Sequence, residues 1–133
     1  MNILVCIKRV PDVGSKFRLT EDGQAIDTAN LGFTISPHEE CAVEEAISLI
    51  EKHGGSTTVL TLGPPAAEEQ LRDRLARGID EAILLSSDIQ EWNPMQTANA
   101  IIDTIRSVEE KSGKFDLLMF GNESADSGNA QVG

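Results

Sequence analysis

Short apolar runs alternate with segments that have the period of an amphipathic helix, and this alternation limits the possible folds most strongly. The runs cover residues 3–7, 57–62, 82–85 and 115–120. Their length and their apolar, partly β-branched composition are typical of strands buried on both faces of a parallel sheet. Strands and helices that alternate over short connections form such a sheet with helices on both faces. We therefore predict one α/β domain over residues 1–133, a doubly wound open parallel sheet in a Rossmann-like three-layer sandwich.

The first helix has the clearest start. Ser36 is a capping residue, Pro37 takes the first helical position, and Glu39 completes a capping box. Apolar residues then recur at helical spacing and form one stripe, and the Glu residues between them are expected on a solvated face. His53-Gly54-Gly55 ends the helix. The stripe consists of Val43, Ala46, Ile47 and Ile50, and the solvated residues are Glu40, Glu44, Glu45 and Glu51.

Two more helices are predicted from similar signals. Gly63-Pro64-Pro65 opens the second, which ends at Gly78, and Asn93-Pro94 opens the third, which ends at Ser112-Gly113. The apolar stripe of the second consists of Ala67, Leu71 and Leu75, and that of the third of Ala98, Ile101, Ile102, Ile105 and Val108.

The remaining connections are less regular. Pro11 ends the first strand because it cannot donate to a sheet ladder. Residues 13–33 are polar and mixed, and form either an ordered loop or a hairpin with short strands at 17–19 and 24–26. The loop 86–92 holds the only tryptophan, Trp92, which either packs at a partner surface or covers the sheet edge.

The formal net charge of −11 argues against nucleic acid and anionic membrane surfaces as partners. No apolar stretch approaches the length of a membrane span, so direct membrane insertion is not expected. Cys6 and Cys41 show no CxxC spacing and are expected to be buried free thiols in a reducing cytoplasm.

Four segments are predicted to meet at the carboxyl edge of the sheet, where open α/β sheets bind ligands. They are residues 6–9, 36–39, 62–64 and 122–133. None contains a paired nucleophile and base, a GxxxxGK[ST] or GxGxxG phosphate loop, or metal-ligand spacing. They offer small residues, backbone amides and two helix N-termini, which suit an adenine nucleotide on which no chemistry is performed.

The glycine-, serine- and asparagine-rich loop 121–133 follows the last apolar run. If a helix begins near Ser127 or Gly128, its free N–H groups would favour a phosphate there. The alternative is an ordinary strand-to-helix turn capped by Asp126 or Ser127.

Four stretches together resemble the N-terminal part of the β subunit of electron transfer flavoprotein, the FixA-like branch included. The resemblance covers essentially the whole chain. The four stretches are Val5-Cys6-Ile7-Lys8-Arg9-Val10-Pro11-Asp12, Ser36-Pro37-His38-Glu39 with Ala42-Val43-Glu44-Glu45-Ala46, Leu62-Gly63-Pro64-Pro65, and Asp126 to Gly133 with its D-x(4)-Q-x-G pattern.

The resemblance implies a nucleotide-binding domain with a structural AMP, paired with an α subunit that carries most of the redox FAD. Such a subunit passes electrons from flavin dehydrogenases to a membrane quinone oxidoreductase, with no substrate turnover of its own expected. The AMP-binding positions that it implies are Cys6, Ser36, Pro37, His38, Glu39, Leu62, Asn122, Glu123, Ser124, Ala125, Asp126, Ser127, Gly128, Asn129, Ala130, Gln131, Val132 and Gly133.

Two alternatives stay open. Some FixA-type relatives bifurcate electrons with NADH and hold a second FAD in place of AMP, but residues 93–98 lack the Asp-Thr associated with them. A free-standing ATP-binding module of the universal-stress type would have a phosphate loop richer in glycine.

Relatives continue well beyond Gly133, so we expect the chain to be truncated and unable to carry electrons alone. Nothing resembling a transit peptide precedes Met1, which favours a bacterial cytoplasm over a mitochondrial matrix.

Overall fold

The computed structural model describes residues 1–88 and 92–133, and its strands and helices follow the predicted alternation. Most strand and helix ends lie within about two residues of the predicted ones, as is usual for such boundaries. The exception is the second helix, whose first turn (residues 65–67) is a 3-10 helix, so that its α-helical part begins only at Glu68. Residues 89–91 of the predicted loop 86–92 lie outside the described part of the chain. The elements are β1 (Asn2–Cys6), β2 (Val10–Pro11), β3 (Phe33–Thr34), α1 (Pro37–His53), β4 (Ser56–Gly63), η1 (Pro65–Ala67), α2 (Glu68–Ala76), β5 (Glu81–Ser86), α3 (Pro94–Ser112) and β6 (Leu117–Phe120).

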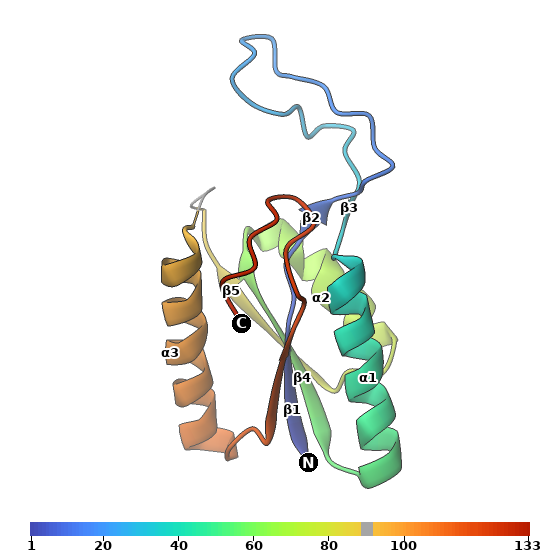
Figure 1. Ribbon diagram of the computed structural model, residues 1–133, viewed down its shortest axis with the longest axis vertical. Helices are drawn as coiled ribbons and strands as arrows, with labels where there is room; N and C mark the ends of the chain where they lie inside the picture. The colour runs from blue at the N-terminus through green and yellow to red at the C-terminus, as the bar shows by residue number, and fades with distance from the viewer. Residues whose placement is uncertain (89–91) are drawn as a thin grey trace.

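The main sheet of the described chain has the strand order β5-β4-β1-β6, and all its pairs are parallel. The chain starts in the middle at β1, proceeds outward through β4 to β5, and then crosses back to β6 on the other side of β1 (Figure 1). The direction of winding therefore reverses between β1 and β6. Beyond the carboxyl ends of two such strands, open α/β sheets have the crevice in which ligands bind.

Helices α1 and α2 cover one face of the sheet and α3 covers the other, which gives the predicted three layers (Figure 1). Side chains alternate along β1, as strand geometry requires. Ile3 and Val5 join the core under α1 and α2, whereas Leu4 and Cys6 join the core under α3. The doubly wound α/β prediction is confirmed.

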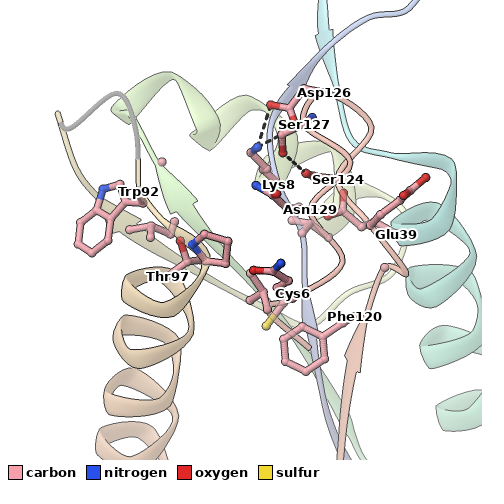
Figure 2. A pocket seen from close by; sticks show the side chains of 18 of the residues that line it. Cys6, Lys8, Glu39, Trp92, Thr97, Phe120, Ser124, Asp126, Ser127 and Asn129 are labelled. Atoms are coloured by element: carbon pink, nitrogen blue, oxygen red, sulfur yellow. Dashed lines mark hydrogen bonds and ion pairs between the residues drawn. The ribbon is translucent and has the colours of Figure 1, made fainter.

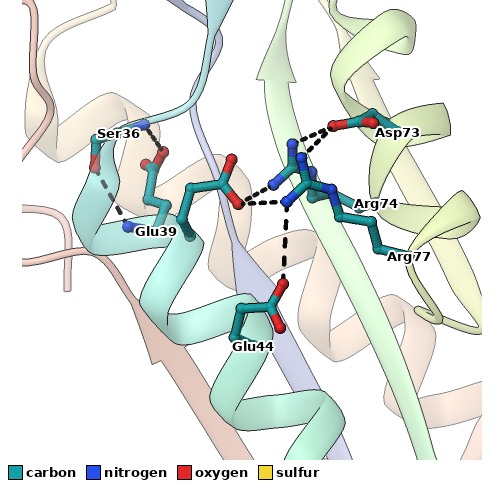
Figure 3. Close-up of polar contacts among 7 residues, drawn as sticks. Ser36, Glu39, Glu44, Asp73, Arg74 and Arg77 are labelled. Carbon is teal, nitrogen blue, oxygen red and sulfur yellow. Dashed lines mark hydrogen bonds and ion pairs between the residues drawn. The ribbon is translucent and has the colours of Figure 1, made fainter.

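A buried arginine joins α1 to α2 (Figure 3). The Arg74 side chain is 4% exposed, and its guanidinium pairs with Glu40 of α1 and Asp73 of α2. Arg77 lies 3.3 Å from the same Glu40 carboxylate. A buried cation requires paired anions, and Glu40 is one of the anions that pair with Arg74. Glu40 is therefore half-buried, and the prediction that it lies on the solvated face of α1 was wrong.

Other burial predictions were wrong as well. Strand β6 was expected to be buried on both faces, but Leu117 is 38% exposed and Leu118 is 43% exposed. Leu75 of α2 is 39% exposed and Ile102 of α3 is 42% exposed. Successive residues four apart on a helix rotate about 40° beyond a full turn, so the stripe from Ala67 through Leu71 drifts off the sheet before it reaches Leu75. Cys41 is exposed on α1, whereas Cys6 is buried as expected.

Between β2 and β3 the chain forms a long arm (residues 12–32) that projects beyond the carboxyl edge of the sheet (Figure 1). Of the two predicted alternatives, an ordered loop or a hairpin, the structure has a loop with one isolated bridge, between Leu19 and Ile26. The Thr20 N–H donates to the Ala25 carbonyl at 2.9 Å beside it. The antiparallel β2–β3 pair at the base of the arm was not predicted.

Candidate functional site

A cleft of about 1040 Å³ opens at the carboxyl edge, where the winding reverses (Figure 2). All four predicted segments contribute to its lining, so the expectation that they meet is confirmed. A volume of this size is at the upper end of what small-molecule and cofactor sites have. The cleft is therefore large enough for a nucleotide.

The cleft takes in most of the predicted site residues, though not all. Those that line it are Cys6, Glu39, Leu62, Asn122, Glu123, Ser124, Asp126, Ser127, Asn129, Ala130, Gln131, Val132 and Gly133. Five others lie beside it without lining it: Ser36, Pro37, His38, Ala125 and Gly128.

The start of α1 is held by the predicted capping box. The Ser36 Oγ accepts the Glu39 N–H at 3.3 Å, and the Ser36 N–H donates to the Glu39 carboxylate at 3.0 Å. The Ser36 hydroxyl also lies 3.5 Å from the Glu123 carbonyl, which it can reach as donor. This hydroxyl therefore joins the helix start to the loop after β6 and is not paired with His38.

Glu39 brings an unusual carboxylate into the cleft. The residue is 6% exposed, and burial raises the pKa of its carboxyl to about 7. Hydrogen bonds from the backbone N–H groups of Ser36 and Lys8, with the charge of Lys8, oppose this shift, while the charge of Asp126 adds to it. The Glu39 carboxyl therefore changes its charge near neutral pH, next to the Lys8–Asp126 pair.

The β6 loop (residues 121–133) contains no helix, so the conditional prediction of a helix start near Ser127 or Gly128 is not met. A single turn closes instead when the Gly128 N–H donates to the Ser124 carbonyl at 2.9 Å. Gly128 has φ of 65°, which favours glycine and ends the turn. The backbone N–H groups of residues 129–133 have no hydrogen-bond partner within the described chain.

Lys8 ties the β6 loop to the end of β1. Its Nζ lies 2.8 Å from each carboxylate oxygen of Asp126. Burial raises the pKa of Asp126, but the hydrogen bond and charge of Lys8 outweigh it and hold that pKa below its usual value. Asp126 also accepts the Ser127 N–H at 2.8 Å, so the carboxylate organises the turn as well.

The wall formed by the start of α3 was missing from the predicted site. Trp92 and Thr97 lie across the cleft from Lys8 and Asp126 (Figure 2). The Trp92 Nε1 donates to the Ser87 Oγ at 3.1 Å. Trp92 therefore lines the cleft, a position that neither sequence-based alternative named. Since each helix after a parallel strand begins at the carboxyl edge, the Asn93-Pro94 start could have indicated this wall.

The floor of the cleft is apolar. Cys6 and Phe120 lie below the polar loop (Figure 2). Burial, with the charge of Glu39, raises the pKa of the Cys6 thiol to about 12, so the thiol stays neutral and is not activated as a nucleophile. Among residues 1–88 and 92–133, no cluster of His, Cys, Asp or Glu is arranged to hold a metal ion.

A basic and aromatic pair, Arg9 and Phe33 of β3, forms another part of the cleft lining. The Arg9 guanidinium carbon lies 3.3 Å from the centre of the Phe33 ring, and both residues line the cleft. The apolar floor of the cleft can hold the base of a nucleotide, and the free amides and the cations can hold its phosphate.

No helix in the described part of the chain is long and apolar enough to cross a membrane.

The sequence of this chain is similar to a known protein family and to several known proteins. Residues 24–133 match the model of the electron transfer flavoprotein domain. The whole chain is 37% identical to Protein FixA from Azorhizobium caulinodans, of which it covers 47%. It is also 37% identical, over 99% of its length, to the electron transfer flavoprotein subunit beta of Bacillus subtilis, of which it covers 49%.

A third relative is the acryloyl-CoA reductase electron transfer subunit gamma of Anaerotignum propionicum. The two sequences are 35% identical over the whole of this chain, which covers 49% of that relative. The chain thus spans about half the length of the curated relatives it matches. The predicted resemblance is confirmed: the chain belongs to the electron transfer flavoprotein domain family, among the FixA and beta-subunit relatives.

Proposed function

We propose that this chain is the nucleotide-binding part of the β-type subunit of an electron transfer flavoprotein, with AMP in the cleft as a structural group. The observation that carries the proposal is the cleft at the winding reversal between β1 and β6, with the free amides of residues 129–133 on one side. Family membership supports the same conclusion independently.

The residues of the cleft fit an adenylate. Cys6 and Leu62 supply the small and apolar surface that a base requires, and backbone N–H groups of the β6 loop supply donors for a phosphate. Gly121 allows the chain to pass close to Glu39, because a Cβ at position 121 would lie 2.7 Å from the Glu39 Cγ. AMP supplies no chemistry in this proposal and stabilises the domain by binding its folded form.

Electron transfer requires a flavin, which the proposal places mainly on a separate α-type subunit. The relatives are themselves named as subunits, an electron transfer flavoprotein subunit beta and an electron transfer subunit gamma, which supports a subunit of a larger carrier. In this proposal the complete heterodimer accepts electrons from flavin dehydrogenases and delivers them to a membrane quinone oxidoreductase. The proposed setting is a bacterial cytoplasm.

The cleft itself favours a second candidate occupant, FAD. The volume of about 1040 Å³ extends to Trp92 and the start of α3, which is more space than AMP fills. A second FAD with NADH as donor is the arrangement that the resemblance to FixA-type proteins implies. The absence of the Asp-Thr pair in residues 93–98 favours AMP.

Mass spectrometry of the released groups tests the proposal. The complete protein is purified with its α-type partner and denatured by heat, and the released nucleotides are identified and counted. We expect one AMP and one FAD per heterodimer. Two FAD molecules would support the second candidate, whereas ATP would indicate a module of the universal-stress type and contradict the proposal.

A further inference from the structure

Two adjacent cations at the end of β1, Lys8 and Arg9, line the same cleft but have different surroundings. The two cations follow β1 and contact different walls of the cleft. Lys8 reaches the β6 loop, and Arg9 reaches Phe33 of β3. Their roles toward a bound anion therefore differ.

The charge of Lys8 is already paired. Its ammonium group is hydrogen-bonded to both carboxylate oxygens of Asp126 at 2.8 Å. A phosphate that took Lys8 would have to displace this carboxylate and leave Asp126 partly buried without its cation. Lys8 therefore acts on a ligand indirectly, by holding the β6 loop in place.

Arg9 has no such partner. Its guanidinium takes part in no ion pair or hydrogen bond within the described residues, and its Nε is buried without a partner. Burial lowers the pKa of Arg9, and the nearby charge of Glu69 partly opposes that shift. The group stays charged in any ordinary buffer because arginine does not lose its proton in proteins.

The stacking on Phe33 prepares Arg9 for an anion. A guanidinium is planar: an aromatic ring binds its face, whereas a phosphate binds the N–H groups along its edge, often with two parallel hydrogen bonds. Phe33 takes one face, at 3.3 Å from the guanidinium carbon, and the N–H groups of the edge have no partner within the described residues. Stacking also restricts the side chain, so less conformational entropy is lost when an anion binds.

We propose that Arg9 contacts the phosphoryl group of the nucleotide in the cleft, while Lys8 is a positioning residue that fastens the β6 loop through Asp126. This assignment rests on the proposed function, because it requires a nucleotide in the cleft. In this assignment Arg9 contacts the nucleotide itself, whereas Lys8 affects binding only through the position of the β6 loop.

Affinities for AMP and adenosine, measured by calorimetry, test the assignment, because the two ligands differ only in the phosphoryl group. The complete protein, with any partner that co-purifies, is freed of nucleotide and compared with its Arg9→Met, Arg9→Lys and Lys8→Met variants. Arg106→Met is the matched control, since Arg106 is exposed on α3 and does not line the cleft. Thermal unfolding of each variant verifies that it is folded.

We expect Arg9→Met to weaken AMP binding about 10- to 100-fold, the usual effect of a lost hydrogen bond to a charged group, and to leave adenosine binding unchanged. Arg9→Lys restores part of the loss, because the charge stays and the planar fork is lost. Lys8→Met weakens both ligands by the same factor, and Arg106→Met weakens neither.

Different results would overturn different statements. If Arg9→Met leaves the ratio of AMP to adenosine affinity unchanged, Arg9 does not contact the phosphoryl group. If Lys8→Met lowers that ratio selectively, the two roles are reversed. If the unmodified protein binds neither ligand, the proposed function fails, and the assignment fails with it.

Discussion

The Lys8 ammonium lies 2.8 Å from each carboxylate oxygen of Asp126, so the end of β1 is joined directly to the turn of the β6 loop. These residues are 118 positions apart. The Lys8 and Asp126 side chains are 44% and 30% exposed, so solvent screens the pair. The pair therefore contributes to the position of the loop more than to the stability of the domain.

Removal of this pair is expected to loosen the loop while the domain stays folded. Lys8→Met should lower the free energy of unfolding by about 0.2–1 kcal/mol, the usual range for exposed pairs. Amide hydrogen exchange of residues 122–128 should become faster, because the turn loses its anchor. Asp126→Asn should have the same effect, and the double variant should be no worse than either single one. Independent, additive effects on exchange would mean that the two side chains do not act together.

Glu39 predicts a specific pH dependence. Its pKa is raised from 4.5 to about 7 in the folded protein, so the folded state favours the protonated carboxyl. The resulting stabilisation is complete below about pH 4.5 and is lost as the pH rises through about 7. At about 1.4 kcal/mol per pKa unit, the change amounts to at most about 3.5 kcal/mol.

The Glu39→Gln variant provides the control for this dependence, because an amide keeps an acceptor for the Ser36 N–H and does not titrate. The difference in the free energy of unfolding between wild type and variant should fall across pH 4.5 to 7. Parallel curves for the two proteins in that window would show that burial does not perturb Glu39. Asp126 affects stability in a more acidic pH range. Because its pKa is lowered in the folded protein, its contribution is present above its usual pKa and is lost as the pH falls through the lowered pKa.

Gly121 is expected to tolerate no side chain. A Cβ there would lie 2.7 Å from the Glu39 Cγ and 3.3 Å from the Glu39 backbone nitrogen. Gly121→Ala should therefore move the β6 loop away from α1 and lower the free energy of unfolding by about 1–3 kcal/mol. Gly14→Ala is the matched control, because the nearest atom to its added Cβ is 3.7 Å away. Equal stability of the two variants in denaturant titrations would contradict this packing.

Trp92 should report directly on occupancy of the cleft. It is the only tryptophan of this chain, which also lacks tyrosine, and it lines the cleft wall opposite Lys8. Titration with AMP or FAD should change its fluorescence in proportion to binding. The Trp92→Phe variant should bind with similar affinity and lose the signal from this chain. An unchanged Trp92 emission at saturating ligand would place the ligand elsewhere.

The layers of the fold could be predicted because each rests on a local pattern. The capping box at Ser36 and the apolar run of residues 3–7 each specify an element without reference to distant residues. Parallel pairing then follows from the alternation of strands and helices, and it brings the carboxyl ends of the strands together. The four segments of the cleft could therefore be named from the sequence.

The detailed contacts of the site could not be predicted. The β6 loop has no periodicity, so nothing in its sequence showed that Asp126 meets Lys8 or that residues 129–133 keep free amides. The stacking of Arg9 on Phe33 depends on the β2–β3 pair at the base of the arm. Each of these strands has only two residues, which is too short to show a strand pattern in the sequence. Leu75 is exposed for a related reason: over two turns of the helix, the apolar stripe rotates away from the sheet, which the spacing of the residues alone did not show.

A crystal structure of the complete protein with its bound nucleotide tests the central claim most directly. We expect an adenylate in the cleft between β1 and β6, its base near Cys6 and Leu62 and its phosphate within hydrogen-bond distance of the amides of residues 129–133. A cleft filled by side chains from the rest of the protein, with the nucleotide bound elsewhere or absent, would contradict the claim.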